Sequence, residues 1–177
     1  AFISLSLYSF ASSYIRKFSN SARDVEVMVF LSILVVLCGR LLVEASLPLS
    51  NLIGLGMGVN ALWYATPIAA GAMLIRILIN SETALIWVVC TSTFLSLLMD
   101  QNALYCSFFI ISGVVASASL AHTKERLNIL RAGFQTGLIN AALALMIELS
   151  NVYITSSAIN PSQPLWDVGL AVFGGIA

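Results

Sequence analysis

Long apolar runs separated by short polar turns are the feature that most constrains how this chain folds. In lipid, a run of about 17 to 25 apolar residues must fold as a helix, because no water is present to satisfy free backbone groups. Lys and Arg collect in cytoplasmic loops. All basic residues except Arg40 lie on the predicted inner side of the membrane. They are Arg16, Lys17, Arg23, Arg76, Lys124, Arg126 and Arg131. The sequence therefore predicts an all-α, polytopic membrane domain with a readable orientation.

The composition excludes two other classes of protein. Hydrophobic residues make up 59% of the chain and charged residues 9%, against roughly 25% charged residues in an average soluble domain. The formal net charge is zero, so no overall positive field favours nucleic acid, and we expect no nucleic-acid partner. Cys38, Cys90 and Cys106 lie inside apolar runs without a CxxC spacing, which is typical of packing residues.

Seven membrane spans are predicted, with the N-terminus outside and the C-terminus in the cytoplasm. The stretch 45–61 is apolar but interrupted by Pro48, Gly54, Gly56 and Gly58, so we expect a re-entrant or interfacial segment there. The first and last apolar runs are short, and we therefore expect the domain to be truncated at both ends. The predicted spans cover about residues 1–15, 25–43, 62–79, 83–99, 103–121, 127–154 and 165–177.

Polar residues inside the spans are the candidate functional residues, since each is costly in lipid unless it is paired. Asn140 and Glu148 lie loosely on one face of the sixth span. An intramembrane polar site or proton relay there requires a third group from another helix, such as Asp100 or Gln135. The plainer alternative is that Glu148 reaches the outer surface and Asn140 bonds across a helix interface.

Other notable residues are better explained by helix packing or membrane anchoring than by catalysis. Gly133 and Gly137 have the GxxxG spacing that lets helix backbones approach closely, more often within one bundle than in a dimer. Arg126 and Arg131 are expected to anchor the inner end of the sixth span, with anionic lipid headgroups as alternative contacts. His122 is the single histidine of the sequence and is expected to be a solvated loop residue. We expect no catalytic, metal or cofactor site in this chain.

Several segments of the chain resemble the seven-transmembrane domain of membrane-anchored HD-domain phosphohydrolases, of the PgpH type that cleaves cyclic di-AMP. The likeness runs in order through most of the chain. Pro67, Arg126, Arg131, Gly133, Gly137 and Asn140 stand in its motifs. The segments are 67–79 (PIAAGAMLIRILI), Ala84-Leu, 112–116 (SGVVA), 126–133 (RLNILRAG), 137–141 (GLINA) and Trp166-Asp167.

The resemblance implies a function for the parent protein. Members carry an extracellular domain before the seven helices and a cytoplasmic HD domain after them, where His and Asp residues hold two divalent metals. The chain would then be a fragment without those two domains, serving as membrane anchor and signal transmitter for a cyclic dinucleotide phosphodiesterase. Its expected partners are the lipid bilayer and either other membrane subunits or its own missing domains. The expected location is a bacterial plasma membrane, or a thylakoid or organelle inner membrane.

Two alternatives from other classes stay open. One is a structural or accessory subunit of a larger membrane complex, which predicts a dry bundle whose Gly133 face meets another protein. The other is a small solute-binding transporter component, which predicts buried polar residues converging on a cavity near the middle of the membrane.

Overall fold

The chain is all-α within the part described by the computed structural model, namely residues 22–53, 61–98, 103–120, 126–155 and 163–176. The prediction of an all-α fold is therefore confirmed. The elements are α2 (Ala22–Ile53), the 3₁₀ helix η1 (Ala61–Ala65), α3 (Ile68–Leu78), α4 (Ser81–Leu98), α5 (Ala103–Ser119), α6 (Arg126–Thr155) and α7 (Gln163–Ile176).

Four stretches among the described residues are long and apolar enough to cross a membrane. Two shorter apolar helices, Ala103–Ser119 and Pro164–Ile176, accompany them. The predicted first span, 1–15, lies outside the described residues, so the count of seven spans and the orientation stay predictions. The four stretches are Arg23–Leu49, Ala61–Leu78, Ser81–Leu98 and Ile129–Ser150.

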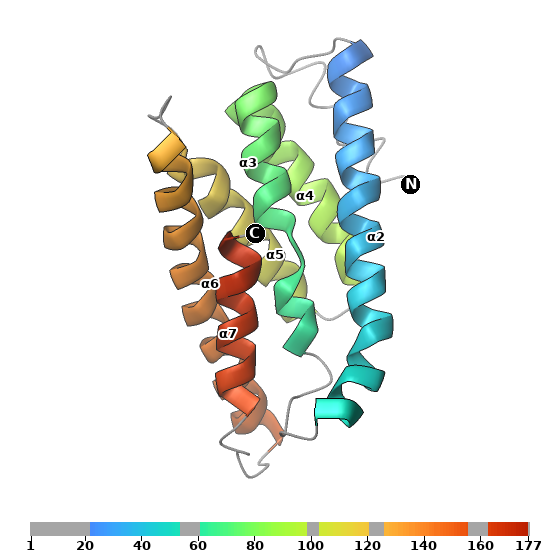
Figure 1. Ribbon diagram of the computed structural model, residues 1–177, viewed down its shortest axis with the longest axis vertical. Helices are drawn as coiled ribbons and strands as arrows, with labels where there is room; N and C mark the ends of the chain where they lie inside the picture. The colour runs from blue at the N-terminus through green and yellow to red at the C-terminus, as the bar shows by residue number, and fades with distance from the viewer. Residues whose placement is uncertain (1–21, 54–60, 99–102, 121–125, 156–162, 177) are drawn as a thin grey trace.

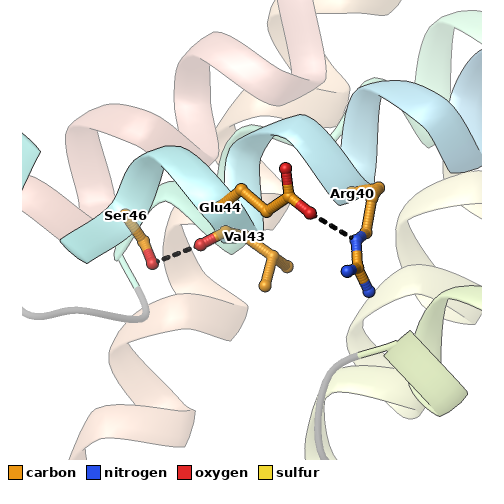
Figure 2. Close-up of polar contacts among 4 residues, drawn as sticks. All are labelled: Arg40, Val43, Glu44 and Ser46. Atoms are coloured by element: carbon orange, nitrogen blue, oxygen red, sulfur yellow. Dashed lines mark hydrogen bonds and ion pairs between the residues drawn. The ribbon is translucent and has the colours of Figure 1, made fainter. Parts of the chain in front are cut away.

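Helix α2 continues well beyond the predicted span 25–43 and includes Pro48. A proline inside a helix removes one backbone donor, and the Ser46 hydroxyl donates to the Val43 carbonyl at 2.6 Å in the turn just before it (Figure 2). The first part of the stretch 45–61 is therefore helical up to Ile53. The glycine-rich remainder, 54–60, lies outside the described residues, and its relation to a membrane surface stays a prediction.

The predicted span 62–79 consists of two helices of different kinds. Pro67 lies between η1 and α3, where its missing donor is not needed. The Thr66 hydroxyl and backbone amide both donate to the Trp63 carbonyl, at 2.8 and 3.2 Å, and so satisfy the last turn of η1. The break is thus supported by local hydrogen bonds rather than left open in the core.

Aromatic residues of η1 and α5 form the centre of the bundle. Trp63 and Tyr64 of η1 pack against Tyr105 with ring centroids 4.9 and 5.6 Å apart. Tyr64 also meets Phe108 edge-on at 5.1 Å, a geometry that aromatic rings favour. Figure 1 shows α2 and α6 at opposite sides of the bundle, with α3, α4 and α5 between them.

Small residues and one arginine join the central helices. A Cβ on Gly71 of α3 would collide with the Trp87 ring of α4, so glycine lets these two helices approach. At the other end of α3, the Arg76 guanidinium donates to the Ser117 carbonyl near the end of α5. Because a helix carries partial negative charge at its C-terminal end, this cation stabilises α5 while tying it to α3.

Candidate functional site

Helices α6 and α7 meet backbone to backbone along a seam of glycines. A Cβ on Gly175 would lie 2.5 Å from the Cα and amide nitrogen of Gly137, and one on Gly137 would lie 3.0 Å from the Val172 carbonyl oxygen. Gly133 is looser, with the Ile176 backbone 3.6 Å away. The helices run antiparallel, since Gly133 faces Ile176 while Gly137 faces Val172 (Figure 1). We call these contacts the α6–α7 seam.

A neighbouring face of α7 rests on η1. A Cβ on Gly174 would collide with the Tyr64 carbonyl oxygen and lie 3.1 Å from the carbonyl carbon of Ala65. Asp167, Ala171 and Gly174 are spaced at i, i+4 and i+7, so they share one face of α7, and all three are buried. Helix α7 is therefore fixed between α6 and the 3₁₀ helix, with no room for a side chain at either glycine contact.

Polar side chains are buried beside this seam. Asn140 on α6 is 1% exposed and Asp167 on α7 is 3% exposed. The Oδ1 atoms of both residues lack a hydrogen-bond partner, as does the indole nitrogen of Trp63. Unpartnered polar atoms are expensive in an apolar interior, which makes these residues candidates for a functional role.

Glu148 of α6 is half-buried and lies within electrostatic range of the Asp167 carboxyl. Val172 lies beside Gly137, and the two helices are antiparallel. Asp167 therefore lies at a level between Asn140 and Glu148 on α6. The Tyr64 hydroxyl of η1 lies within electrostatic range of both carboxyls and beside Tyr105 of α5. Three side chains from other elements thus lie within electrostatic range of Tyr64, and Glu148 among them is only half-buried. We call the four residues together the carboxyl cluster: Tyr64, Tyr105, Glu148 and Asp167.

The structure distributes the predicted site residues over three places. Pro67 separates η1 from α3, and Asn140, Gly133 and Gly137 lie along α6 in or beside the seam. Arg131 is exposed near the start of α6, whereas the side chain of Arg126 is not among those described, and neither is His122. Asp100 lies outside the described residues and Gln135 is exposed.

Asp167 is a buried polar group within electrostatic range of Glu148 that was not selected from the sequence as a site residue. The indication in the sequence is that Asp167 is an acidic residue close to the start of one apolar run, just as Glu148 lies near the end of the run before it. That signal is weak, because either residue alone is compatible with a surface position. The packing of α6 against α7 is what brings the two carboxyls within electrostatic range of each other.

A hollow of 270 Å³ opens beside Gly133, between α3, α6 and α7. Its walls are apolar side chains and glycine backbone, so it offers packing space rather than polar ligands. It is lined by Ala70, Met73, Leu74, Ile77, Ile129, Leu130, Gly133, Gly175 and Ile176.

Helix α2 carries a second pair of charges on the far side of the bundle. The Arg40 Nε donates to Glu44 Oε1 at 2.8 Å, one turn apart on the same helix (Figure 2). Both side chains are more than half exposed, at 58% and 59%. The pair borders a larger apolar groove of 440 Å³ between α2 and α4.

The described residues contain no group of three His, Cys, Asp or Glu side chains able to hold a metal ion. The resemblance implies a two-metal centre in a separate HD domain, which this observation does not test.

Comparisons with known proteins agree with the predicted family. A family model described as "7TM receptor with intracellular HD hydrolase" matches residues 1–177, the whole chain. The cyclic-di-AMP phosphodiesterase PgpH of Bacillus subtilis (strain 168) is 30% identical over 110 residues, which cover 59% of this chain and 15% of that protein. The chain thus corresponds to a small part of this relative. No solved structure matches the chain.

Proposed function

Because this chain belongs to the family of 7TM receptors with an intracellular HD hydrolase, we propose that it anchors a cyclic dinucleotide phosphodiesterase in the membrane and transmits a signal to it. The family match over all 177 residues carries the proposal. The name of the PgpH relative supplies cyclic di-AMP as the substrate to test first. In this proposal the 177 residues supply no catalytic group.

The proposed topology has seven spans with the N-terminus outside and the C-terminus in the cytoplasm. The bias of basic residues supports it, since Arg76 lies near the end of α3 and Arg131 near the start of α6. Since Lys and Arg collect in cytoplasmic loops, these positions support a cytoplasmic assignment for that side of the bundle. A domain following α7 would then emerge where cyclic dinucleotides are found.

The proposed path for a signal is the α6–α7 seam. Helix α7 is the last described helix, and glycine contacts hold it against α6 on one side and η1 on the other. Backbone contacts of this kind cannot slide without a discrete change of packing. A displacement of η1 or α6 would therefore be passed to α7 rather than absorbed by side chains.

The test compares three forms of the natural full-length protein in membrane vesicles, assayed for cyclic di-AMP hydrolysis. These are the wild type, Gly137→Ala in the seam, and Gly169→Ala, where a Cβ would meet nothing within 4 Å. We expect hydrolysis in all three, with at least a twofold change in rate in Gly137→Ala alone. Absence of hydrolysis in the wild type would refute the phosphodiesterase proposal. Equal rates of hydrolysis in all three forms would show that the domain anchors the protein without transmitting a signal through the seam.

Cysteine labelling tests the orientation separately. A cysteine placed at Ser81, at the start of α4, is expected to react with a membrane-impermeant reagent only after the cells are opened. One placed at Ala103, at the start of α5, is expected to react in intact cells. The reverse pattern would overturn the proposed orientation while leaving the family assignment untouched.

The convergence of buried polar groups also favours one alternative, a solute-binding transporter component. Asn140, Asp167 and Tyr64 are each at most 3% exposed, and each carries an unpartnered oxygen. Discontinuous helices such as η1 and α3 are found at transporter sites. Solute uptake by the same vesicles, lost in Asp167→Asn and unrelated to hydrolysis, would support this alternative.

A further inference from the structure

Helices α2 and α4 form an apolar groove on the surface of the bundle. Its volume is 440 Å³, and its walls include Ile33 and Leu37 of α2 and Phe94 and Leu98 of α4. Ile33, Leu37 and Phe94 are exposed, so the groove is open to the surroundings of the bundle, which in a membrane are lipid. Acyl chains are as apolar as these side chains, and a groove between two helices gives one chain more contacts than a single helix does.

The two helices that form the groove are joined beside it at two levels. The Trp87 indole donates to Ser32 Oγ at 2.7 Å, and a Cβ on Gly39 would lie 2.7 Å from Leu95 Cδ2, so glycine lets α2 approach α4 there. The Ser32 hydroxyl also donates to a backbone carbonyl of its own helix and is thus engaged within the protein. The other polar residue of the lining is Arg40.

An ion pair lies at the Arg40 end of the groove. The Arg40 Nε donates to Glu44 Oε1, one turn further along α2 (Figure 2). A guanidinium has five donors, and this hydrogen bond uses one of them. The two terminal nitrogens point away from Glu44 (Figure 2). Both side chains are more than half exposed, so a positive and a negative group are accessible side by side.

The order of groove and ion pair along α2 matches the orientation of a phospholipid. From Ser32 to Arg40 the groove follows the helix for about 12 Å at 1.5 Å per residue, and one leaflet has a hydrocarbon depth of about 15 Å. Arg40 lies about 26 Å along the helix from Arg23, at the predicted inner side. The pair therefore lies near the opposite boundary of the hydrocarbon, where a chain seated in the groove would place its headgroup.

We propose that the groove binds one molecule of phosphatidylethanolamine. An acyl chain lies between α2 and α4, the phosphate accepts from the terminal nitrogens of Arg40, and the ammonium donates to the Glu44 carboxylate. Arginine suits phosphate because its planar fork of donors matches the oxygens. Charge complementarity selects the rest of the headgroup, since the protein presents one cation and one anion at the same level.

Two other common phospholipids fit this pair less well. Phosphatidylglycerol offers the phosphate but brings no cation to Glu44, so the carboxylate would face an anionic headgroup. Phosphatidylcholine brings a cation without N–H donors, so it cannot hydrogen-bond to the carboxylate. The inference concerns the membrane domain alone and does not depend on the phosphodiesterase proposal.

Native mass spectrometry of the full-length protein tests the proposal. The protein in detergent is titrated with phosphatidylethanolamine, phosphatidylcholine or phosphatidylglycerol carrying identical acyl chains. We expect the wild type to bind phosphatidylethanolamine about fivefold more tightly than either of the other lipids, the size of effect expected for one exposed ion pair. Equal affinities would overturn the proposal, and tighter binding of phosphatidylglycerol would overturn it in favour of an anionic lipid.

Two variants test the headgroup contacts. Glu44→Gln should remove the preference for phosphatidylethanolamine, and Arg40→Gln should weaken the binding of all three lipids, because they share the phosphate. Glu26→Gln and Arg131→Gln are the matched controls, since both residues are exposed and lie away from the groove. They should bind lipids like the wild type. A preference that persists in Glu44→Gln, or unchanged affinities in Arg40→Gln, would overturn the proposed headgroup site.

A third variant tests the position of the acyl chain. Leu37→Trp places a larger side chain in the groove, whereas Leu41→Trp places it one turn away, at a position outside the lining. The two leucines are 54% and 57% exposed, so neither substitution disturbs the packed interior. We expect weaker binding of all three lipids in Leu37→Trp alone. Wild-type affinities in Leu37→Trp would overturn the placement of the chain in the groove.

Discussion

The two sides of this bundle are held together by different means. At the α6–α7 seam, glycines bring backbones into contact and leave no side chain that can yield. At α2, large apolar side chains point away from the other described helices: Phe30 is 65% exposed and Ile33 is 62% exposed. Two hydrogen bonds from the Trp87 indole join α2 to α4, one to Ser32 Oγ at 2.7 Å and one to the Met28 carbonyl at 3.2 Å.

This difference in packing distinguishes a rigid part of the membrane domain, the seam, from a part whose position can adapt, helix α2. Lipid is as apolar as a leucine side chain, so burying α2 more deeply would gain little from the hydrophobic effect, and helix association depends on close packing and hydrogen bonds. The seam has close backbone packing at Gly137 and Gly175, whereas α2 has a few polar links. We therefore expect the seam to resist movement and α2 to follow its surroundings.

The largest expected effect comes from adding one methyl group to the seam. Gly175→Ala places a Cβ 2.5 Å from the Gly137 backbone, which cannot shift without separating the helices. We expect a loss of about 1–3 kcal/mol in the free energy of unfolding, as for other overpacked cores, measured by denaturant titration in detergent micelles.

Two other glycine-to-alanine substitutions serve as controls for the loss of stability expected in Gly175→Ala. Gly133→Ala meets the Ile176 backbone at 3.6 Å, an ordinary contact, and Gly169→Ala meets nothing within 4 Å. Both should be within about 0.5 kcal/mol of the wild type or more stable, since alanine favours helix. Equal losses in all three variants would show that the seam is not tightly packed.

An intermediate effect is expected at the junction of α2 and α4. Trp87→Phe removes the indole donor that reaches Ser32 and Met28, and hydrogen bonds between membrane helices contribute about 0.6 kcal/mol on average and at most about 1.7. We expect faster hydrogen exchange in α2 and little change in α6 and α7.

Ser32→Ala serves as the control for that variant, because it removes one acceptor and keeps the Trp87 ring against Gly71. It should reproduce the faster exchange of α2 in weaker form. Faster exchange in α7, equal to that in α2, would contradict the separation of the bundle into a fixed and an adaptable side.

The smallest effect is expected at the ion pair of α2. Glu44→Gln removes the partner of Arg40, but both side chains are more than half exposed, and exposed ion pairs contribute about 0–1 kcal/mol. The melting temperature should fall by no more than a few degrees, and Glu26→Gln on the same helix should leave it unchanged. A loss as large as that of Gly175→Ala would show that the pair is buried against a further partner.

The fold was largely predictable because apolar runs and polar turns encode helices locally. The predicted spans begin at about residues 83 and 103, and α4 and α5 begin at Ser81 and Ala103. The family was predictable for a similar reason, since its motifs are contiguous stretches. The break between η1 and α3 was not predicted, because Pro67 is equally compatible with the first turn of a continuous helix.

The carboxyl cluster was only half predictable. The cost of burying polar groups singles out Asn140 and Glu148 without any structure. The proximity of Glu148 to Asp167 depends on the register between α6 and α7. Glycine contacts elsewhere along the two helices determine that register. A single sequence contains no direct signal of that register, so the partner could not be chosen among the available acidic residues.

Arg76 illustrates how a single residue can serve two events that follow one another. While the helices are being inserted, its charge marks the predicted cytoplasmic end of α3. Once they have assembled, the same guanidinium closes the carboxyl end of α5 by donating to the Ser117 carbonyl. Lysine would keep the charge but lack the planar fork of donors. Arg76→Lys should therefore separate the two events, giving a chain that is inserted in the native direction but assembles into a looser bundle.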